Sequence, residues 1–240
     1  MTTLSLPGRT DGATCWHARL DQLVISQIPC CLSAEEKARA GGFVFAQDRS
    51  RYIAAHNLMR FLLAGHVGGE PFDLHIETGP HGKPLLAGSS TRFSLSHSGD
   101  VAVVAIGNRG ELGVDVEQLR PVPDAMAMAA EHFTDNEMIS LAALPPSERA
   151  EAFLTCWTRK EACLKALGQG LLLAPRDLEV GIEPDCREVE MQTEAGVQWL
   201  ALVPLKTPSA TVASLAEWPV PPGRRPLYDR LVTRSEEVQP

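Results

Sequence analysis

Hydrophobic and polar positions follow two different periods along the chain, and these periods recur in a similar order. An alternation of apolar and polar residues predicts a strand, whereas apolar residues three and four apart predict a helix. The predicted strands lie at 16–28, 93–97, 101–106, 112–117, 178–182, 197–203 and 210–215. The predicted helices begin at Ser33 and cover 47–64, 124–132, 134–144 and 148–167. Strand, helix and strands therefore occur before residue 111 and again after it, so we expect an α+β fold of two similar halves.

Two of the predicted helices begin with a capping box. Ser33 and Thr134 each precede a glutamate by three residues. The Ser or Thr side chain then bonds the third helical amide, and the Glu side chain bonds the amide of the first residue in return. The helix over 47–64 has residues spaced for one apolar stripe: Tyr52, Ile53, His56, Met59, Leu62 and Leu63.

Length and composition restrict the class of protein. The chain has 240 residues, of which 44% are hydrophobic, enough for one large domain or two small ones. The longest uninterrupted apolar run, 101–106, is far shorter than the ~20 residues of a membrane span. The first ten residues lack the basic and apolar regions of a secretory signal. We therefore expect a cytoplasmic protein that does not contact membranes.

The charge of the chain argues against general binding of nucleic acid. Asp and Glu number 30 against 22 Lys and Arg, a net charge of −8, whereas DNA-binding surfaces are basic. Residues 35–60 are the exception, with five basic and three acidic side chains. This segment suits an anionic partner, although a solvated helix face explains the charges as well. The six cysteines show no C-x2-C spacing, so we expect reduced, structural thiols.

A pair of carboxylates lies on the strand predicted over 112–117. Every second residue from Leu112 is apolar, so Asp115 and Glu117 project together from the opposite face. Carboxylates this close repel each other unless a cation or solvent separates them, and oxygen ligands suit Mg²⁺. The alternative is the solvated polar face of an edge strand.

The helix over 148–167 carries a third carboxylate in an unusual place. Glu161 lies within the apolar arc around Trp157, which we interpret as a packing residue. Lys165 follows one turn later, and Lys160 borders the arc on its other side. An ordinary Glu161–Lys165 helix pair explains the spacing but not the apolar surroundings, in which a carboxylate is unfavourable unless paired or bound to metal. Burial beside Trp157 also predicts a raised pKa for Glu161 and hence a role as a base.

His97 ends the predicted strand at 93–97 and has serines at positions 94, 96 and 98 around it. A serine–histidine pairing suggests a hydrolase, although the chain contains no G-x-S-x-G elbow. Hydroxyls and an imidazole next to a turn also suit a phosphate contact. A structural histidine is the third interpretation.

Several of these stretches together closely resemble the signature of the surfactin-type 4′-phosphopantetheinyl transferases. The strongest is WTRKEACLK at 157–165, which is followed by GQGL at 168–171. It is accompanied in the family's order and spacing by HGKP at 81–84, FSLSHS at 93–98, GVDVE at 113–117 and FTDNE at 133–137. The resemblance spans about 33 to 182, most of the chain.

The resemblance implies a monomeric pseudo-dimer of two α/β halves that binds coenzyme A and Mg²⁺, or Mn²⁺, in the cleft between them. The N-terminal half, 1–111, would contact the nucleotide and the carrier protein. The C-terminal half, 112–218, would hold the metal and the catalytic residues. A proline-rich tail, 219–240, has no role implied by the resemblance.

The family motifs also imply roles for individual residues. Asp115, Glu117 and Glu161 would hold the metal, and Glu161 and Lys165 would be catalytic. The side chains implied to contact coenzyme A are Arg39, Arg51, Lys83, Ser96, His97, Lys160 and Lys165. Where several family members have a lysine near the 3′-phosphate, this chain has Glu36, so Lys37, Arg39 or Arg51 would take that role.

The implied reaction is attack by a carrier-protein serine on the β-phosphorus of coenzyme A, yielding the holo-carrier and adenosine 3′,5′-bisphosphate. Glu161 would take the serine proton, directly or through water, and the 35–60 segment would bind an acidic carrier. Three alternatives stay open: a Mg²⁺-dependent phosphodiesterase or pyrophosphatase using the same carboxylates, a non-catalytic nucleotide- or carrier-binding scaffold, and a serine hydrolase using His97. Which biosynthetic pathway supplies the carrier also stays open.

Overall fold

The computed structural model describes residues 13–23, 30–79, 81–168, 173–193, 196–207 and 210–218. The elements in chain order are β1 (Ala13–Arg19), α1 (Ala34–Gly41), α2 (Ala46–Val67), β2 (Ile76–Thr78), β3 (Pro84–Leu86), β4 (Arg92–Ser98), β5 (Val101–Gly107), β6 (Glu111–Gln118), α3 (Ala125–His132), α4 (Asp135–Ala143), α5 (Pro146–Leu167), η3 (Pro175–Asp177), β7 (Arg187–Thr193), β8 (Gly196–Pro204) and β9 (Thr211–Trp218). Within this described part, no helix combines the length and apolar character needed to span a bilayer. The predicted tail and the GQGL residues 169–171 lie outside it.

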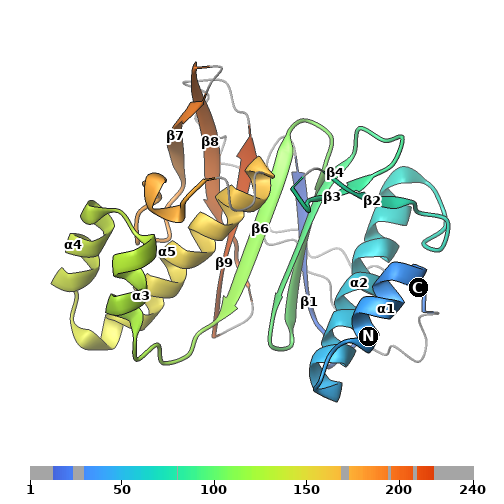
Figure 1. Cartoon of the computed structure of the whole chain (residues 1–240), viewed down its shortest axis with the longest axis horizontal. Coiled ribbons are helices and arrows are strands. Elements are labelled where there is room, and N and C mark those ends of the chain that lie inside the picture. The colour runs from blue at the N-terminus through green and yellow to red at the C-terminus, as the bar shows by residue number, and fades with distance from the viewer. Residues whose placement is uncertain are drawn as a thin grey trace.

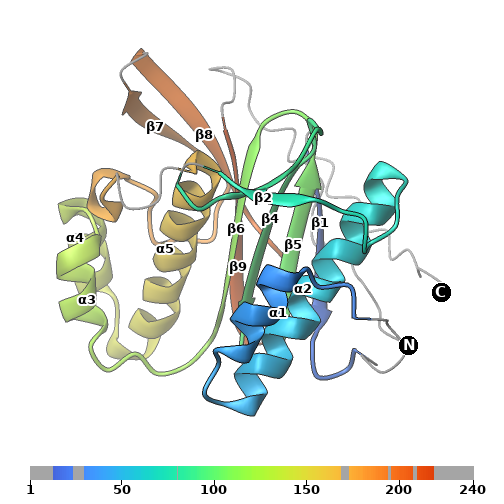
Figure 2. The same cartoon turned by 45° about the vertical axis from the view of Figure 1, so that its right-hand side comes forward.

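The chain forms two halves, each built from an antiparallel sheet and helices, as the α+β prediction requires. The N-terminal sheet has the order β1-β5-β4, and the C-terminal sheet has the order β6-β9-β8-β7. Helices α1 and α2 lie on one side of the molecule and α3, α4 and α5 on the other, with the two sheets between them (Figure 1). The same layering is visible from the second direction (Figure 2).

Three buried clusters follow these layers. One packs α2 on the outer face of the N-terminal sheet, and another packs α3, α4 and α5 on the C-terminal sheet. The third, which we call the central cluster, lies between the sheets and includes Val103 of β5, Val114 of β6 and Leu215 of β9. The two halves therefore share apolar core, and the predicted core positions Leu112, Val114 and Val116 belong to it.

Local sequence signals set the helix boundaries. Both predicted capping boxes are present, at Ser33 with Glu36 and at Thr134 with Glu137. The longest helices, α2 and α5, end at glycines 68 and 168 in the left-handed conformation, which glycine adopts without steric cost. These boundaries fix the lengths of the two helices that face each other across the sheets.

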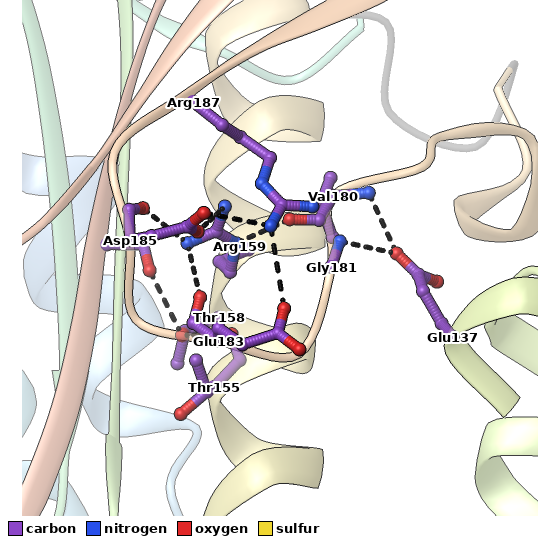
Figure 3. Close-up of polar contacts among 10 residues, drawn as sticks. Glu137, Thr155, Thr158, Arg159, Val180, Gly181, Glu183, Asp185 and Arg187 are labelled. Carbon is purple, nitrogen blue, oxygen red and sulfur yellow. Dashed lines mark hydrogen bonds and ion pairs between the residues drawn. The ribbon is translucent and has the colours of Figure 1, made fainter. Parts of the chain in front are cut away.

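One predicted strand is wrong. Residues 178–182 form no strand, because side chains rather than another strand bind their backbone. Glu137 Oε1 accepts bonds of 2.7 Å and 3.0 Å from the amides of Val180 and Gly181, and Arg159 Nε donates to the Val180 carbonyl at 2.7 Å (Figure 3). The strand beside β8 is instead β7. Of the predicted strand at 16–28, β1 includes residues up to Arg19, and residues 24–28 lie outside the described part.

Candidate active site

A cleft of about 1120 Å³ lies between the two halves. Its lining includes Arg39 of α1, His56 of α2 and His97 of β4 on one side, and Glu161 and Lys165 of α5 on the other. The cleft thus brings together side chains that are more than a hundred residues apart in the sequence. Of the three predicted metal ligands, Glu161 lines this cleft, whereas Asp115 and Glu117 are not among its lining residues.

Strands β4 and β6 lie side by side although they belong to separate sheets, and three serines of β4 join them. In the β4–β5 pairing, these serines lie opposite Ala105, Val103 and Val101, all of which belong to the central cluster, so they face β6. His97 lies on the other face of β4. The bonds run from the Val114 amide to Ser94 Oγ at 3.0 Å, from Ser96 Oγ to Asp115 Oδ1 at 2.8 Å, and from Ser98 Oγ to Glu117 Oε2 at 2.8 Å.

We call Ser94, Ser96 and Ser98 the serine seam. It holds the two carboxylates of β6 in place from the neighbouring half of the molecule. The alternation that predicts the strand therefore also orients Asp115 and Glu117. The hydroxyls are engaged in these bonds, which argues against their use as nucleophiles of a hydrolase.

Helix α5 crosses directly over β6 at Gly113. A Cβ atom at this position would lie 2.0 Å from the carbonyl oxygen of Ala162, so no other residue fits. This close approach lets the side chain of Lys165 reach the strand. Its Nζ lies 2.6 Å from Asp115 Oδ1 and 3.2 Å from Ser96 Oγ. The glycine of the GVDVE motif thus allows α5 to pack directly against β6.

Glu161 lies partly buried near the other two carboxylates. Burial raises its pKa, the charges of Asp115 and Glu117 raise it further, and Lys165 lowers it. The predicted direction is confirmed, and the three carboxylates are close enough to repel one another. Among the residues that the structure describes, however, no group of three or more acidic, His or Cys side chains has a metal-binding arrangement.

Asp115 provides the test of whether the site suits a cation. Its Oδ1 bonds Ser96 and Lys165, but its buried Oδ2 has no hydrogen-bond partner. A buried carboxylate oxygen without a partner is unfavourable, and a divalent cation would satisfy it. Asp115, Glu117 and Glu161 supply the oxygen ligands that Mg²⁺ prefers, although among the described residues they do not stand in a metal-binding arrangement.

Another part of the cleft lining consists of Arg39, Tyr52, His56 and His97, which we call the histidine end; Glu35 and Glu36 line the cleft as well. The rings of Tyr52 and His56 stack with centroids 3.8 Å apart, and Arg39 Cζ lies 5.9 Å from the Tyr52 centroid. Burial lowers the pKa of His97, and the charges of Lys165 and Arg51 lower it further. Sequence reasoning missed His56 and Tyr52, because their spacing on an apolar stripe gave no sign of a cleft.

Lys83 lines the cleft, but protein groups neutralise its ammonium. Lys83 Nζ lies 2.8 Å from Glu111 Oε2 and donates to the carbonyl of Ala166 at 2.9 Å. This residue therefore ties the turn between β2 and β3 to the end of α5. Its predicted contact with coenzyme A remains a prediction, with the added constraint of these two partners.

Lys160 does not reach the cleft, and the structure corrects its predicted contact with coenzyme A. Consecutive helical residues point about 100° apart, so the neighbour of Glu161 faces the interior of the C-terminal half. Its buried Nζ pairs with Glu137 Oε2 at 2.7 Å and donates to the carbonyls of Pro175 and Leu178. Lys160 thus fixes α5 to the loop that carries Val180.

Arg51 has protein partners for its guanidinium. Its Nε donates to Asp100 Oδ1 at 2.8 Å, and its Nη1 lies 3.5 Å from Asp48 Oδ1. Arg51 is not among the lining residues of the cleft, but its charge acts on His97, which is, so its contact with coenzyme A stays a prediction. Glu36, the departure from the family pattern, bonds Arg60 Nε at 2.7 Å and the Ser33 amide at 2.8 Å.

Comparison with known proteins is consistent with this geometry. Residues 14–108 match the family described as "4′-phosphopantetheinyl transferase, N-terminal", and 111–207 match the "4′-phosphopantetheinyl transferase superfamily". The chain is 33% identical over 210 residues to the 4′-phosphopantetheinyl transferase HetI of Nostoc sp., covering 85% of this chain and 88% of that protein. It is 28% identical over 155 residues to the 4′-phosphopantetheinyl transferase of Bacillus subtilis, covering 64% and 68%. It is 28% identical over 165 residues to the human L-aminoadipate-semialdehyde dehydrogenase-phosphopantetheinyl transferase, covering 64% of this chain and 53% of that protein.

Proposed function

The chain belongs to the 4′-phosphopantetheinyl transferase superfamily, and on that premise we propose that it transfers 4′-phosphopantetheine from coenzyme A to a serine of an acyl or peptidyl carrier protein. One observation carries the proposal: the carboxylates of β6 and α5 and the ammonium of Lys165 gather between the halves, with Lys165 Nζ 2.6 Å from Asp115 Oδ1. The motifs favour the surfactin-type branch. The products are the holo-carrier and adenosine 3′,5′-bisphosphate.

Asp115, Glu117 and Glu161 are the proposed ligands of Mg²⁺, or of Mn²⁺ in its place. The unpartnered Oδ2 of Asp115 and the raised pKa of Glu161 both favour a cation here. When bound, the ion supplies positive charge to the diphosphate oxygens. Lys165, which pairs with Asp115 in the structure, then becomes available to the diphosphate of coenzyme A.

Glu161 is the proposed general base. Its carboxylate is partly buried and lies close to Asp115 and Lys165, where the diphosphate is proposed to bind, so it can meet the attacking hydroxyl there. It takes the proton of the carrier serine, directly or through water, as the serine oxygen bonds the β-phosphorus and the bond to the bridging oxygen breaks. Lys165 donates a hydrogen bond to the departing bisphosphate, which a fixed cation in a cleft stabilises strongly.

The two ends of the cleft orient coenzyme A. Its diphosphate lies at Lys165, and its 3′-phosphate lies at Arg39 and His97. Both sides of the cleft come from one chain, which supports a functional monomer with halves at 1–111 and 112–218. Lys37, Arg39 and Arg49 are exposed around α1, and their charges suit an acidic carrier protein.

A carrier-loading assay tests the proposal. We expect the mass of an apo-carrier to rise by one phosphopantetheine group, with adenosine 3′,5′-bisphosphate formed in equal amount. E161Q should bind coenzyme A but lose turnover by about 10²- to 10⁴-fold, the usual contribution of a general base. E151Q, an exposed change on the same helix, is the matched control. Cleavage of coenzyme A without carrier loading would identify a phosphodiesterase instead, and an unaffected E161Q would remove Glu161 from catalysis.

A further inference from the structure

His56 is held by aromatic contacts at the histidine end of the cleft. Its ring stacks on Tyr52 at 3.8 Å with an interplanar angle of 28°. The Tyr52 ring is itself fixed by Phe43, whose centroid lies 5.3 Å away, and by the guanidinium of Arg39. The imidazole lines the cleft together with His97, so a ligand at this end meets it.

The hydrogen bond of His56 identifies its tautomer. Nδ1 lies 3.0 Å from the backbone carbonyl oxygen of Tyr52, which can only accept. Nδ1 therefore carries the proton, and Nε2 of the neutral ring carries the lone pair. At neutral pH, His56 offers the cleft an acceptor rather than a donor.

The surroundings of His56 keep the ring neutral in the free protein. Burial lowers its pKa to about 4. Of the groups that face it, the Tyr52 carbonyl and Glu36 raise the pKa, whereas His97 and Arg39 lower it. Arg60 Nε lies 2.7 Å from Glu36 Oε2 and neutralises this carboxylate, so Glu36 raises the pKa of His56 only weakly.

A phosphomonoester changes this balance. Above pH 7 its oxygens are all acceptors, and so is Nε2, so a hydrogen bond between them requires one additional proton. The negative charge of the phosphate favours the imidazolium and raises the pKa of the ring. Coenzyme A has its monoester on the ribose, away from the diphosphate that Lys165 attracts.

We propose that His56 recognises the 3′-phosphate of coenzyme A by taking up a proton as the phosphate binds, and thereby discriminates coenzyme A from its 3′-dephospho form. This inference rests on the proposed function, because it takes coenzyme A as the ligand. The Nε2 atom of His56, and not merely an aromatic ring at this position, distinguishes coenzyme A from its 3′-dephospho form. Proton uptake is its signature.

Isothermal titration calorimetry tests this inference without carrier protein or turnover. Coenzyme A and dephospho-coenzyme A are each titrated at pH 7.5 in two buffers of different ionisation enthalpy, which gives the number of protons taken up. Wild-type protein should take up more protons with coenzyme A than with the dephospho form. H56F, which retains a ring but no nitrogen, should lose this difference and bind coenzyme A roughly tenfold more weakly, the size of one charged hydrogen bond.

Two further variants sharpen the result. H56Q retains a neutral donor, so it should keep part of the discrimination but lose the proton uptake. H66Q, an exposed change on the same helix, should behave as wild type. Unchanged affinity for dephospho-coenzyme A shows that each variant is folded.

The possible failures are distinguishable. If H56F keeps both the discrimination and the proton uptake, the role of His56 is wrong while the transferase proposal stands. If wild-type protein takes up equal numbers of protons with coenzyme A and with dephospho-coenzyme A, the role of His56 is also wrong and the transferase proposal again stands. If wild-type protein binds neither nucleotide, the proposed function itself fails.

Discussion

At the residue scale, two carboxylates of the site differ in how far their negative charge is compensated: Asp115 pairs with Lys165, whereas Glu161 does not have this compensation. Lys165 compensates Asp115 at 2.6 Å, and the Asp115 side chain is only 9% exposed. Glu161 is left with burial and two neighbouring carboxylates, and these raise its pKa. In the absence of a divalent cation, the charged form of Glu161 is therefore disfavoured.

This imbalance predicts that E161Q stabilises the metal-free protein in a pH-dependent way. A carboxyl whose pKa is raised on folding favours the protonated fold, so wild-type stability falls as pH rises above the unfolded pKa of about 4.3. Glutamine resembles the neutral form at every pH. Urea unfolding in EDTA should show E161Q more stable by about 0.5–1 kcal/mol at pH 7.5, a usual gain for relieving active-site strain.

The pH dependence supplies the control for this prediction. The advantage of E161Q should shrink as the pH is lowered toward the unfolded pKa of about 4.3, because the folded carboxyl takes up its proton first. A constant advantage across this range would mean that charge at Glu161 is not its cause. Excess Mg²⁺ should reverse the order of stability, because wild-type protein alone retains all three proposed ligands.

Residue types and spacing predict only part of the site. The position of Glu161 in an apolar arc correctly indicates a raised pKa. A helical wheel gives the angle between Lys160 and Glu161 but not which of them faces a cleft, and Lys160 meets Glu137 instead. Likewise, the charge of Arg51 does not reveal that Asp100, far along the chain, is its partner.

At the element scale, period and capping predict most helices and strands, but not what their polar faces contact. The alternation over 93–97 predicts β4, yet nothing local shows that its serines bond β6. The opposite error occurs at 178–182, where alternation suggests a strand. Long-range side chains, Glu137 and Arg159 among them, satisfy that backbone instead.

The serine seam predicts different consequences for two similar substitutions. S98A removes the donor to Glu117 Oε2, a proposed metal ligand, and should weaken Mg²⁺ binding about tenfold, as loss of outer-shell support does. S94A leaves the Val114 amide unsatisfied and should reduce the free energy of unfolding by about 1–3 kcal/mol with Mg²⁺ affinity unchanged. Calorimetric titration with Mg²⁺ and urea unfolding separate the two. Equal effects of both variants on metal affinity would contradict the assigned roles.

The crossing of α5 over β6 predicts severe damage from G113A. A methyl group 2.0 Å from the Ala162 carbonyl must displace the helix or the strand. We expect a loss of stability of about 1–3 kcal/mol or more from overpacking, together with loss of carrier loading as Lys165 moves from Asp115. Thermal unfolding and the loading assay measure both. A fully active, stable G113A would disprove this close approach.

At the scale of the whole molecule, the halves are joined by apolar packing and by polar contacts around the cleft. The central cluster draws on both sheets, and Lys83 connects the β2–β3 turn to α5. The pattern of elements predicts two similar halves, but it cannot show that they share a core. That property depends on which sheet faces meet.

Shared packing predicts that the chain unfolds as one cooperative unit. Calorimetric and van't Hoff enthalpies should agree, because neither sheet retains a complete core without the other. Differential scanning calorimetry of the metal-free protein makes the measurement. Two resolved transitions would show that the central cluster contributes little to stability.

The joint between β4 and β6 has an evolutionary consequence. Backbone ladders depend little on residue identity, whereas three hydroxyls are each specified by a single codon. Substitution of Ser96 or Ser98 would therefore remove a bond to a carboxylate of β6 while both sheets keep their backbone ladders. In evolution, the positions of these two acidic groups can change more easily than the architecture that carries them.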